Sequence, residues 1–151
     1  MKSSGWRLGV VVSRFNSEIT GKLLASCLKT LDRHGIPHSR IRTLWVPGSY
    51  EIPWGAQEMA LSKRFDAIIC LGAILKGETP QNAHISASTI HHLQSISLST
   101  RVPCLLGVIT PNTYAQAKAR THGELDRGRE AALAAIALLR EAASIPKTSR
   151  G

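Results

Sequence analysis

Four short apolar segments recur along the chain, and each is followed by a stretch in which apolar residues return at helical spacing. Three of the four segments are nearly continuous in Val, Ile and Leu, with little alternation of polar residues. That pattern is typical of parallel strands that are covered on both faces. The predicted strands are residues 8–12, 41–46, 67–71 and 102–109, the last of them around Pro103.

The stretches between the strands predict amphipathic helices. Over residues 17–34, the side chains of Ile19, Leu23 and Leu31 share one stripe. Gly35 then supplies a C-terminal cap. Further helices are predicted over residues 50–62, 81–98 and 127–143, with a shorter one over residues 113–120. Strands that alternate with helices imply right-handed crossovers, so we expect an α/β fold, a three-layer α/β/α sandwich around a four-stranded parallel sheet.

The length of 151 residues suits one domain. A chain of this length can bury roughly 70% of its unfolded surface, so it needs no disulfide or metal to be stable. We therefore expect a single domain over residues 1–151, in which residues 145–151 form a flexible tail. No apolar run approaches the ~18–20 residues of a membrane helix, and the first residues do not resemble a signal peptide.

The cysteines and histidines give no sign of disulfide bonds or of a metal centre. Cys27, Cys70 and Cys104 are widely spaced and set among apolar residues, with no CxxC pair. We interpret them as buried, reduced thiols of a cytoplasmic protein. His34 and His38 have helical spacing, but the glycine and proline between them break any helix, so no metal site is expected.

The charge is strongly unbalanced, with 19 Lys and Arg residues against 10 Asp and Glu residues, a formal +9. This excess indicates an acidic surface, a nucleic acid or a phosphorylated small molecule as a partner, or simply a cationic solvated exterior. Aromatic residues make up only 5% of the sequence, and no nucleic-acid recognition motif is present. A basic nucleic-acid-binding module is therefore the weakest of the functional alternatives.

Polar residues, glycines and prolines follow each of the four predicted strands. They occupy residues 13–16, 47–51, 76–82 and 110–113. Ligands of open α/β sheets bind beyond the carboxyl ends of the strands. Loops between strands and helices are often polar in any protein, but four such loops together predict a shared binding edge.

Residues 72–79, Gly-Ala-Ile-Leu-Lys-Gly-Glu-Thr, have the glycine spacing of a P-loop with one decisive change. Glu78 stands where the phosphate-binding lysine should be, and its carboxylate would repel a nucleotide's phosphates, which argues against an NTPase. No GxGxxG follows the first strand, which weakens a dinucleotide interpretation. Gly77 can leave backbone amides open, and Thr79 followed by Pro80 fits a helix N-cap and first position. The loop suits a single phosphate, although it could merely begin a helix.

Specific motifs occur in order from the first strand to the last helix. Arg14-Phe15-Asn16 follows the first strand, and Val-Pro-Gly-Ser-Tyr-Glu-Ile-Pro spans residues 46–53. The series continues with Asp-Ala-Ile at 66–68, Lys-Gly-Glu-Thr at 76–79, Gly-Val-Ile-Thr at 107–110, Gln116 with Arg120, and Gly128 with Glu130. Over residues 8–139 the chain resembles the lumazine synthase family of riboflavin biosynthesis.

The resemblance implies a flavodoxin-like fold with a four-stranded parallel sheet. It implies the condensation of 5-amino-6-(D-ribitylamino)uracil with 3,4-dihydroxy-2-butanone 4-phosphate to 6,7-dimethyl-8-ribityllumazine, with release of inorganic phosphate. In the family, no cofactor or metal takes part in this reaction. The family's active sites lie between neighbouring subunits of a homopentamer, and some members pack twelve pentamers into a sixty-subunit shell.

The resemblance also assigns substrate-binding roles. Phe15, with Asn16 beside it, matches the aromatic residue that stacks on the pyrimidine ring, since a flat π face suits a flat heterocycle. Ser49 and Glu51, on either side of Tyr50, match positions that hold the ribityl hydroxyls. Glu51 could instead be only a first-turn acid favoured by the helix dipole. The segment that lines the pyrimidine site, largely through its backbone, is Ala73, Ile74 and Leu75.

The same resemblance assigns phosphate binding to two parts of the chain. Gly77, Glu78 and Thr79 match the family's phosphate loop. Arg120 matches an arginine of the neighbouring subunit, whose guanidinium can hold phosphate at two points and stabilise it as a leaving group. It could also be one more surface cation. Arg127 falls where the family usually has a lysine, in a register that needs a one-residue deletion.

Two positions depart from the family pattern. Gln81 stands where the family has a histidine, the expected proton shuttle, because imidazole titrates near neutral pH. His84, one turn further along, is predicted to take over the proton transfer, or to share it through Gln81 or a water. Alternatively, His84 only replaces an aromatic residue that is common there. Leu106 stands where phenylalanine is common, which keeps the site apolar but leaves more room.

The resemblance therefore predicts an active lumazine synthase with Gln81, His84 and Arg120 as its catalytic residues. Its expected partners are its two small-molecule substrates and further copies of itself, in a homopentamer or a sixty-subunit shell. Neither a membrane nor a specific nucleic acid is expected as a partner. The changes at Gln81 and Leu106 leave a second interpretation open, a catalytically weak shell or scaffold protein of the same fold.

Overall fold

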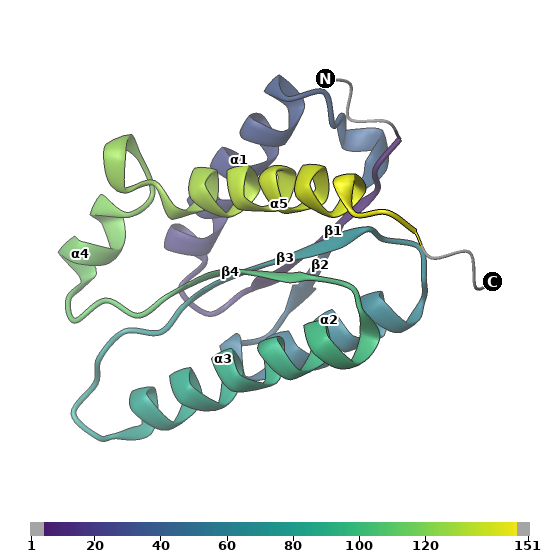
Figure 1. Cartoon of the computed structure of the whole chain (residues 1–151). Coiled ribbons are helices and arrows are strands. Elements are labelled where there is room, and N and C mark those ends of the chain that lie inside the picture. Colours follow the sequence, from purple (N-terminus) through teal and green to yellow (C-terminus); the bar gives the residue numbers. More distant parts are fainter. Residues whose placement is uncertain (1–4, 148–151) are drawn as a thin grey trace.

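A four-stranded parallel sheet runs through the middle of the molecule, with the strand order β2-β1-β3-β4. The computed structural model describes residues 5–147 (Figure 1). The strands are β1 (Leu8–Ser13), β2 (Ile41–Val46), β3 (Ala67–Ala73) and β4 (Cys104–Ile109). The central strands β1 and β3 are buried along their whole length, whereas the edge strands β2 and β4 are partly exposed. Double-sided burial explains the uninterrupted aliphatic runs in the sequence.

Helices cover both faces of the sheet, which confirms the predicted three-layer α/β/α sandwich (Figure 1). α1 (Ser17–Arg33) and α5 (Arg127–Ser144) lie on one face, and α2 (Ile52–Leu61) and α3 (Gln81–Thr100) lie on the other. The short helix α4 (Tyr114–Ala119) follows β4. Three 3₁₀ turns, η1 (His38–Arg40), η2 (Ser49–Glu51) and η3 (Gly123–Leu125), complete the described elements.

Alternate residues of β1 supply the two cores. Val10 and Val12 join the core under α1 and α5, while Val11 joins the core under α2 and α3. All three side chains are fully buried. This period-two division fixes the pairing register, because a one-residue slip would exchange the two faces.

The pair of helices on the first face is held together at the start of α5. Asp126 caps that helix by accepting the Arg129 N–H at 3.0 Å, and its carboxylate also accepts the hydroxyl of Ser26 on α1. At Gly128, a Cβ atom would lie 2.2 Å from the carbonyl oxygen of Leu23. Only glycine permits this approach of α5 to the backbone of α1.

Most predicted boundaries agree with the structure, and the differences arise at proline and glycine. Gly35 ends α1 as predicted, with a φ of 85° and its N–H donating to the Asp32 carbonyl at 3.0 Å. The prediction of Thr79 as N-cap was wrong, because Pro80 holds the N-cap position and α3 begins at Gln81. The last strand begins at Cys104, after Pro103, instead of at residue 102.

The predicted tail, residues 145–151, falls partly outside the described residues. Residues 145–147 follow α5 and are exposed, and residues 148–151 lie beyond the part of the chain that the structure describes. Flexibility of this segment therefore stays a prediction.

The three cysteines are free thiols, and two of them are buried as predicted. Burial, with a smaller contribution from the Asp126 carboxylate, raises the pKa of the Cys27 thiol to about 12. Cys104 is only half-buried, so the prediction of burial was wrong for this residue, which begins the edge strand β4. The hydrogen bond with Cys70 on β3 lowers the pKa of the Cys104 thiol and raises the pKa of the Cys70 thiol.

Candidate active site

The four polar loops lie together beyond the carboxyl ends of the strands, as the sequence predicts (Figure 1). Backbone hydrogen bonds continue between neighbouring segments after the strands end. The Phe15 N–H donates to the Pro47 carbonyl at 2.9 Å, and the Lys76 N–H donates to the Pro111 carbonyl at 3.2 Å. These bonds extend the order of the sheet into the loops and hold them in fixed positions.

A cavity of about 540 Å³ opens between the first three of these loops and the start of α3. This volume lies in the usual range of small-molecule sites, about 300–1,000 Å³. The cavity, called the first cavity below, brings together most of the predicted substrate- and phosphate-binding residues. They are Phe15, Asn16, Ser49, Tyr50, Ala73, Ile74, Leu75, Gly77, Thr79 and Gln81.

The aromatic side chains at the mouth of the first cavity are unusually exposed. Phe15 is 72% exposed and Tyr50 is 70% exposed, although aromatic residues of this size normally bury much of their surface. An open aromatic face beside a cavity is suited to stack on a flat ring.

Asn16 fixes the loop that carries Phe15. Its backbone adopts a left-handed conformation with a φ of 62°, which asparagine tolerates better than most residues. Its carbonyl accepts the N–H groups of Ile19 and Thr20 in the first turn of α1, and its side-chain Nδ2 donates to the Ala73 carbonyl at 3.1 Å. The loops after β1 and β3 are thus bonded to each other directly.

Two serine hydroxyls lie beneath the first cavity, close to Gly72. A Cβ atom on Gly72 would lie 2.7 Å from Ser49 Oγ and 3.3 Å from Ser13 Oγ. Ser13 is fully buried, and its Oγ has no hydrogen-bond partner among the described residues. Glycine is therefore required here, since any side chain would collide with the residues below the cavity.

Three predicted residues do not line either of the cavities at this edge. Glu51 Oε1 accepts the Gly48 N–H at 3.1 Å, an arrangement that fixes the start of η2. Glu78 and His84 are exposed to solvent. Although His84 is one turn along α3 from Gln81, only Gln81 of the two lines the first cavity.

A second cavity, of about 430 Å³, lies beside β4. It contains the remaining predicted residues Leu106, Arg120 and Arg127. Leu106 is 53% exposed on this edge strand, and Arg120 is half-buried with its Nη1 donating to the Gln116 carbonyl at 3.0 Å. The other guanidinium donors of Arg120 make no hydrogen bond within the described residues, so they are available to an anion.

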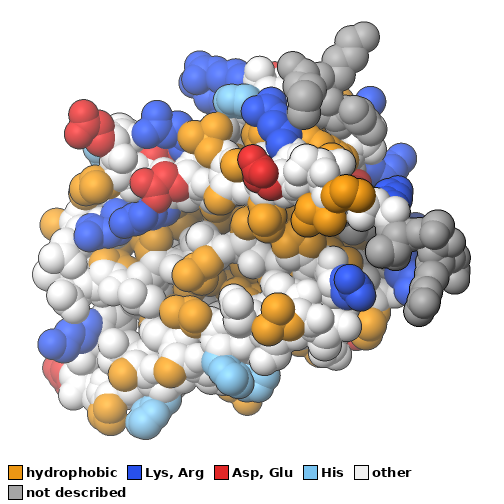
Figure 2. All heavy atoms as spheres, viewed as in Figure 1, with side chains coloured by type: hydrophobic (Ala, Val, Ile, Leu, Met, Phe, Trp, Pro, Cys, Tyr) orange, Lys and Arg blue, Asp and Glu red, His pale blue; other side chains and the backbone are white. Residues whose placement is uncertain are grey.

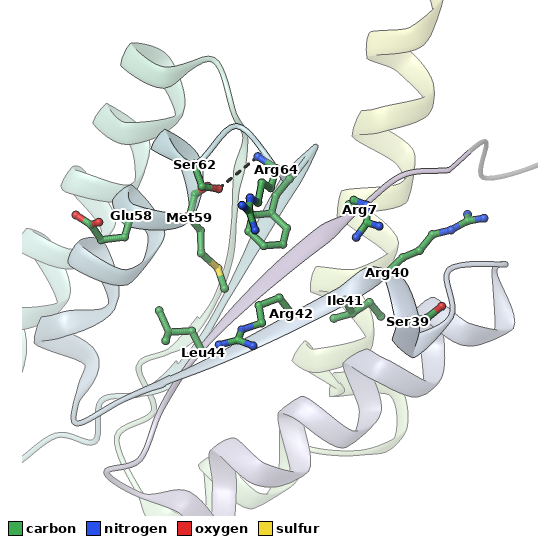
Figure 3. A pocket seen from close by; sticks show the side chains of 11 residues that line it. Arg7, Ser39, Arg40, Ile41, Arg42, Leu44, Glu58, Met59, Ser62 and Arg64 are labelled. Atoms are coloured by element: carbon green, nitrogen blue, oxygen red, sulfur yellow. Dashed lines mark hydrogen bonds between the residues drawn. The ribbon is translucent and has the colours of Figure 1, made fainter.

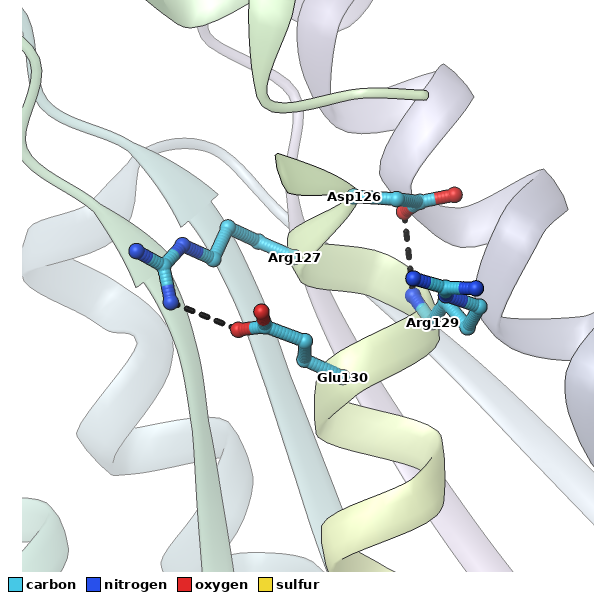
Figure 4. Close-up of polar contacts among 4 residues, drawn as sticks. All are labelled: Asp126, Arg127, Arg129 and Glu130. Carbon is cyan, nitrogen blue, oxygen red and sulfur yellow. Dashed lines mark hydrogen bonds and ion pairs between the residues drawn. The ribbon is translucent and has the colours of Figure 1, made fainter. Parts of the chain in front are cut away.

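Arg127 is held in place by its own helix. Its Nη1 lies 2.6 Å from Glu130 Oε2 in an exposed ion pair one turn along α5 (Figure 4). Its backbone N–H donates to the Arg120 carbonyl at 2.9 Å. The two arginines of the second cavity are therefore joined through the main chain. Within one chain, however, the phosphate loop and Arg120 line different cavities.

Several lining residues were not named individually as site residues in the sequence analysis, although most of them lie in the polar loops predicted to form the binding edge. In the first cavity they are Gly48, Lys76, Asn82 and Ile85, and in the second they include Pro111, Asn112 and Gln116. Helical spacing could have indicated Ile85, which is four residues after Gln81 on α3. Gly48, Lys76 and Gln116 lie within the quoted motifs, but no chemical signal separated them from their neighbours.

Neither a metal cluster nor a membrane span is found within residues 5–147. No group of three or more His, Cys, Asp or Glu side chains there is placed to hold a metal ion. No helix in the same range is both long and apolar enough to cross a membrane.

The fold and the site define an α/β protein with two cavities at the carboxyl edge of its sheet, the edge at which open α/β sheets bind their ligands. A family model described as 6,7-dimethyl-8-ribityllumazine synthase matches residues 5–142. The chain belongs to this family, which confirms the family and the fold that the motifs predict.

Two curated relatives carry the same description, 6,7-dimethyl-8-ribityllumazine synthase. The protein from Protochlamydia amoebophila is 42% identical over 134 residues, which cover 88% of this chain and 78% of that relative. The protein from Nostoc sp. is also 42% identical over 134 residues, which cover 86% of this chain and 70% of that relative. The range that the family model matches, residues 5–142, includes every lining residue of both cavities.

Proposed function

We propose that the chain condenses 5-amino-6-(D-ribitylamino)uracil with 3,4-dihydroxy-2-butanone 4-phosphate to 6,7-dimethyl-8-ribityllumazine and releases phosphate. Its membership of the family supports this reaction. The observation that carries the proposal is the first cavity, where Phe15, Ser49 and Thr79 meet from three separate loops. An aromatic face, a hydroxyl and a phosphate loop in one cavity match a flat, polyol-bearing ring that reacts with a phosphorylated partner.

The pyrimidine substrate would lie against Phe15, with the backbone of residues 73–75 along one side of its ring. Ser49 Oγ, at the base of the cavity, can exchange hydrogen bonds with a ribityl hydroxyl. Glu51 can accept a second one if the bond from the Gly48 N–H leaves its other carboxylate oxygen free. Binding both substrates in fixed positions supplies most of the acceleration in a condensation of this kind.

Phosphate release needs positive charge at the leaving group. Gly77 and Thr79 line the first cavity beside the start of α3, where backbone N–H groups and the helix dipole favour an anion. Arg120 would approach from a neighbouring subunit, because in its own chain it lines the second cavity. Arg127 would stand beside it.

Proton transfer is the step in which this chain departs most from the family pattern. Gln81 lines the first cavity and can orient a substrate or a water by hydrogen bonds, but it does not exchange protons at neutral pH. The exposed His84, one turn away, is the nearest imidazole along α3, so we assign it the transfer through Gln81 or a water.

Replacing His84 with alanine is expected to lower the rate by about 10²-fold, the low end for general acid–base catalysis. Gln81→Ala should also lower the rate, because Gln81 lines the first cavity and can orient the substrate or water through which the proton passes. An unimpaired His84→Ala enzyme would show that His84 is only a surface residue.

The reaction itself is tested by mixing purified protein with both substrates. Phosphate release and lumazine absorbance should rise together, well above the spontaneous rate. The alternative, a catalytically weak shell or scaffold protein, is favoured by the absence of any histidine from the lining of the first cavity. A rate equal to the spontaneous background would support that alternative.

Self-association is supported by exposed apolar residues next to the second cavity. Figure 2 shows hydrophobic side chains gathered between α3 and α5, over the free edge of β4. Exposed apolar residues on these elements are Ile90, Leu98, Leu106, Leu133 and Leu138. Contiguous apolar surface of this kind usually marks a protein interface. We propose a homopentamer, free or packed into a sixty-subunit shell, and a cytoplasmic location, to which the free thiols add support.

Subunit complementation should reveal whether each site is shared. Phe15→Ala and Arg120→Ala variants, unfolded together in equal amounts and refolded as mixed oligomers, are expected to recover about a quarter of the wild-type activity. The fraction follows because a random pair of neighbours supplies both intact residues one time in four. Each variant refolded alone is the control, and sites built within one subunit would give no recovery.

A further inference from the structure

A third cavity, of about 830 Å³, lies away from the carboxyl edge and shares no lining residue with the two cavities described above. Its residues come from the amino ends of the strands, from β2, and from the end of α2 with the turn that follows it. They are Arg7, Ser39, Arg40, Ile41, Arg42, Leu44, Glu58, Met59, Ser62, Arg64 and Phe65. We call it the arginine cleft (Figure 3).

The charge of the arginine cleft is strongly one-sided. Four of its residues are arginines and one is glutamate, so its formal charge is 4 − 1 = +3. Within residues 5–147, none of these guanidinium groups forms an ion pair or a hydrogen bond. Asp66, which lies nearby, accepts the backbone N–H of Arg7 at 2.8 Å and not its guanidinium.

The base of the cleft is apolar. Leu44 and Phe65 pack against the core under α2 and α3, and Met59 is almost fully buried in that core. Figure 3 shows Arg42 on β2 and Arg64 after α2 on either side of this apolar base. The Ser62 hydroxyl accepts the backbone N–H of Arg64 at 3.3 Å, which fixes the turn that presents Arg64.

We propose that the arginine cleft binds a nucleotide, a ligand with a flat ring and at least two linked phosphates. The apolar base gives the ring a surface from which water is excluded, and the guanidinium groups can hold phosphate oxygens in pairs. Glu58 can accept hydrogen bonds from the hydroxyls of the sugar. The volume lies within the range of small-molecule sites, about 300–1,000 Å³.

Each part of the ligand is complementary to one part of the cleft. A single phosphate would engage too few of the arginines, which come from three separate segments of the chain. A purely anionic ligand would leave the apolar base exposed to water. This site is independent of the proposed condensation, because its residues lie outside both cavities at the carboxyl edge.

Calorimetric titration of the assembled protein with ADP tests the proposal. We expect one ADP per chain, and at least about 10-fold weaker binding in the Arg42→Gln/Arg64→Gln variant, because each lost contact is a charge-assisted hydrogen bond. Arg140→Gln removes one positive charge from α5, as Arg64→Gln does from the cleft, and should bind ADP like the wild type. Arg120→Gln should also bind normally, which separates this site from the phosphate site. The Arg64→Gln single variant repeats the measurement with one change if the double variant unfolds.

Two further titrations separate the ring from the phosphates. Pyrophosphate and adenosine should each bind at least about 10-fold more weakly than ADP, since each engages half of the cleft. Pyrophosphate binding as tightly as ADP would overturn the proposal, because the apolar base would then contribute nothing. Absence of saturable ADP binding, or an equal loss in Arg140→Gln, would overturn it as well.

Discussion

Replacing Arg120 with alanine is expected to slow lumazine formation by about 10²–10³-fold, the usual effect of removing one preorganised donor from a developing anion. Phosphate departs in this reaction, and the half-buried guanidinium of Arg120 keeps donors available in the second cavity. Negative charge increases on the leaving oxygen as the bond breaks, so Arg120→Ala should lower mainly kcat. Phosphate release and lumazine absorbance, followed at saturating substrate, measure this effect.

Lys118→Ala is the matched control for Arg120→Ala. Lys118 lies on α4, of which Arg120 is the C-cap, and it is exposed and does not line the second cavity. It should keep nearly full activity although it loses the same charge. Arg120→Lys should recover only part of the rate, because an ammonium group cannot hold two phosphate oxygens as a planar guanidinium does. Equal rates for Arg120→Ala and the wild type would remove Arg120 from the mechanism.

Replacing Gly128 with alanine is expected to lower the free energy of unfolding by about 3 kcal/mol, at the upper end for overpacking. The added Cβ would lie 2.2 Å from the carbonyl oxygen of Leu23, which is main chain and cannot rotate away. α5 would have to move off α1 and loosen the core between them. Thermal unfolding should show a decrease of about 6–12 °C in Tm for a chain of this length.

Gly21→Ala provides the opposite case within the same helix pair. Gly21 lies inside α1, and a Cβ there would have no neighbour within 4 Å. Alanine favours a helix over glycine by up to about 1 kcal/mol, so this variant should be unchanged or slightly more stable. If the two variants unfolded alike, the close approach at Gly128 would not limit the stability of the fold.

The layers of this fold could be predicted from the sequence because burial on both faces leaves a clear pattern. The strands β1 and β3 are buried throughout, and their aliphatic runs indicated both. The prediction ended β3 two residues early, because Gly72 followed by Ala73 is typical of a loop. In the structure both residues continue the ladder with β4. Residue 72 is a glycine because a side chain there would collide with Ser49, and not because the chain turns.

Most residues of the site could be predicted from the sequence, but their division between two cavities could not. Family motifs indicated Phe15, Thr79 and Arg120, yet no linear pattern could show that Arg120 lines a different cavity from the other two. The spacing of His84 from Gln81 predicted that both would lie at the site, but only Gln81 lines the first cavity. The direction of the His84 side chain could not be predicted from the sequence. The arginine cleft was not predicted at all. Its cations come from three distant segments that form no motif, so only folding gathers them.

The bond between Asn16 and the Ala73 carbonyl bears on how fast and how tightly a flat ring can bind. It joins two loops before any ligand arrives, and the left-handed turn at Asn16 already holds Phe15 in the open. Little conformational entropy is then lost on docking, because the receptor is ordered in advance. Association should follow a single kinetic phase, and the affinity for the ring should reflect the stacking contact instead of the ordering of a loop.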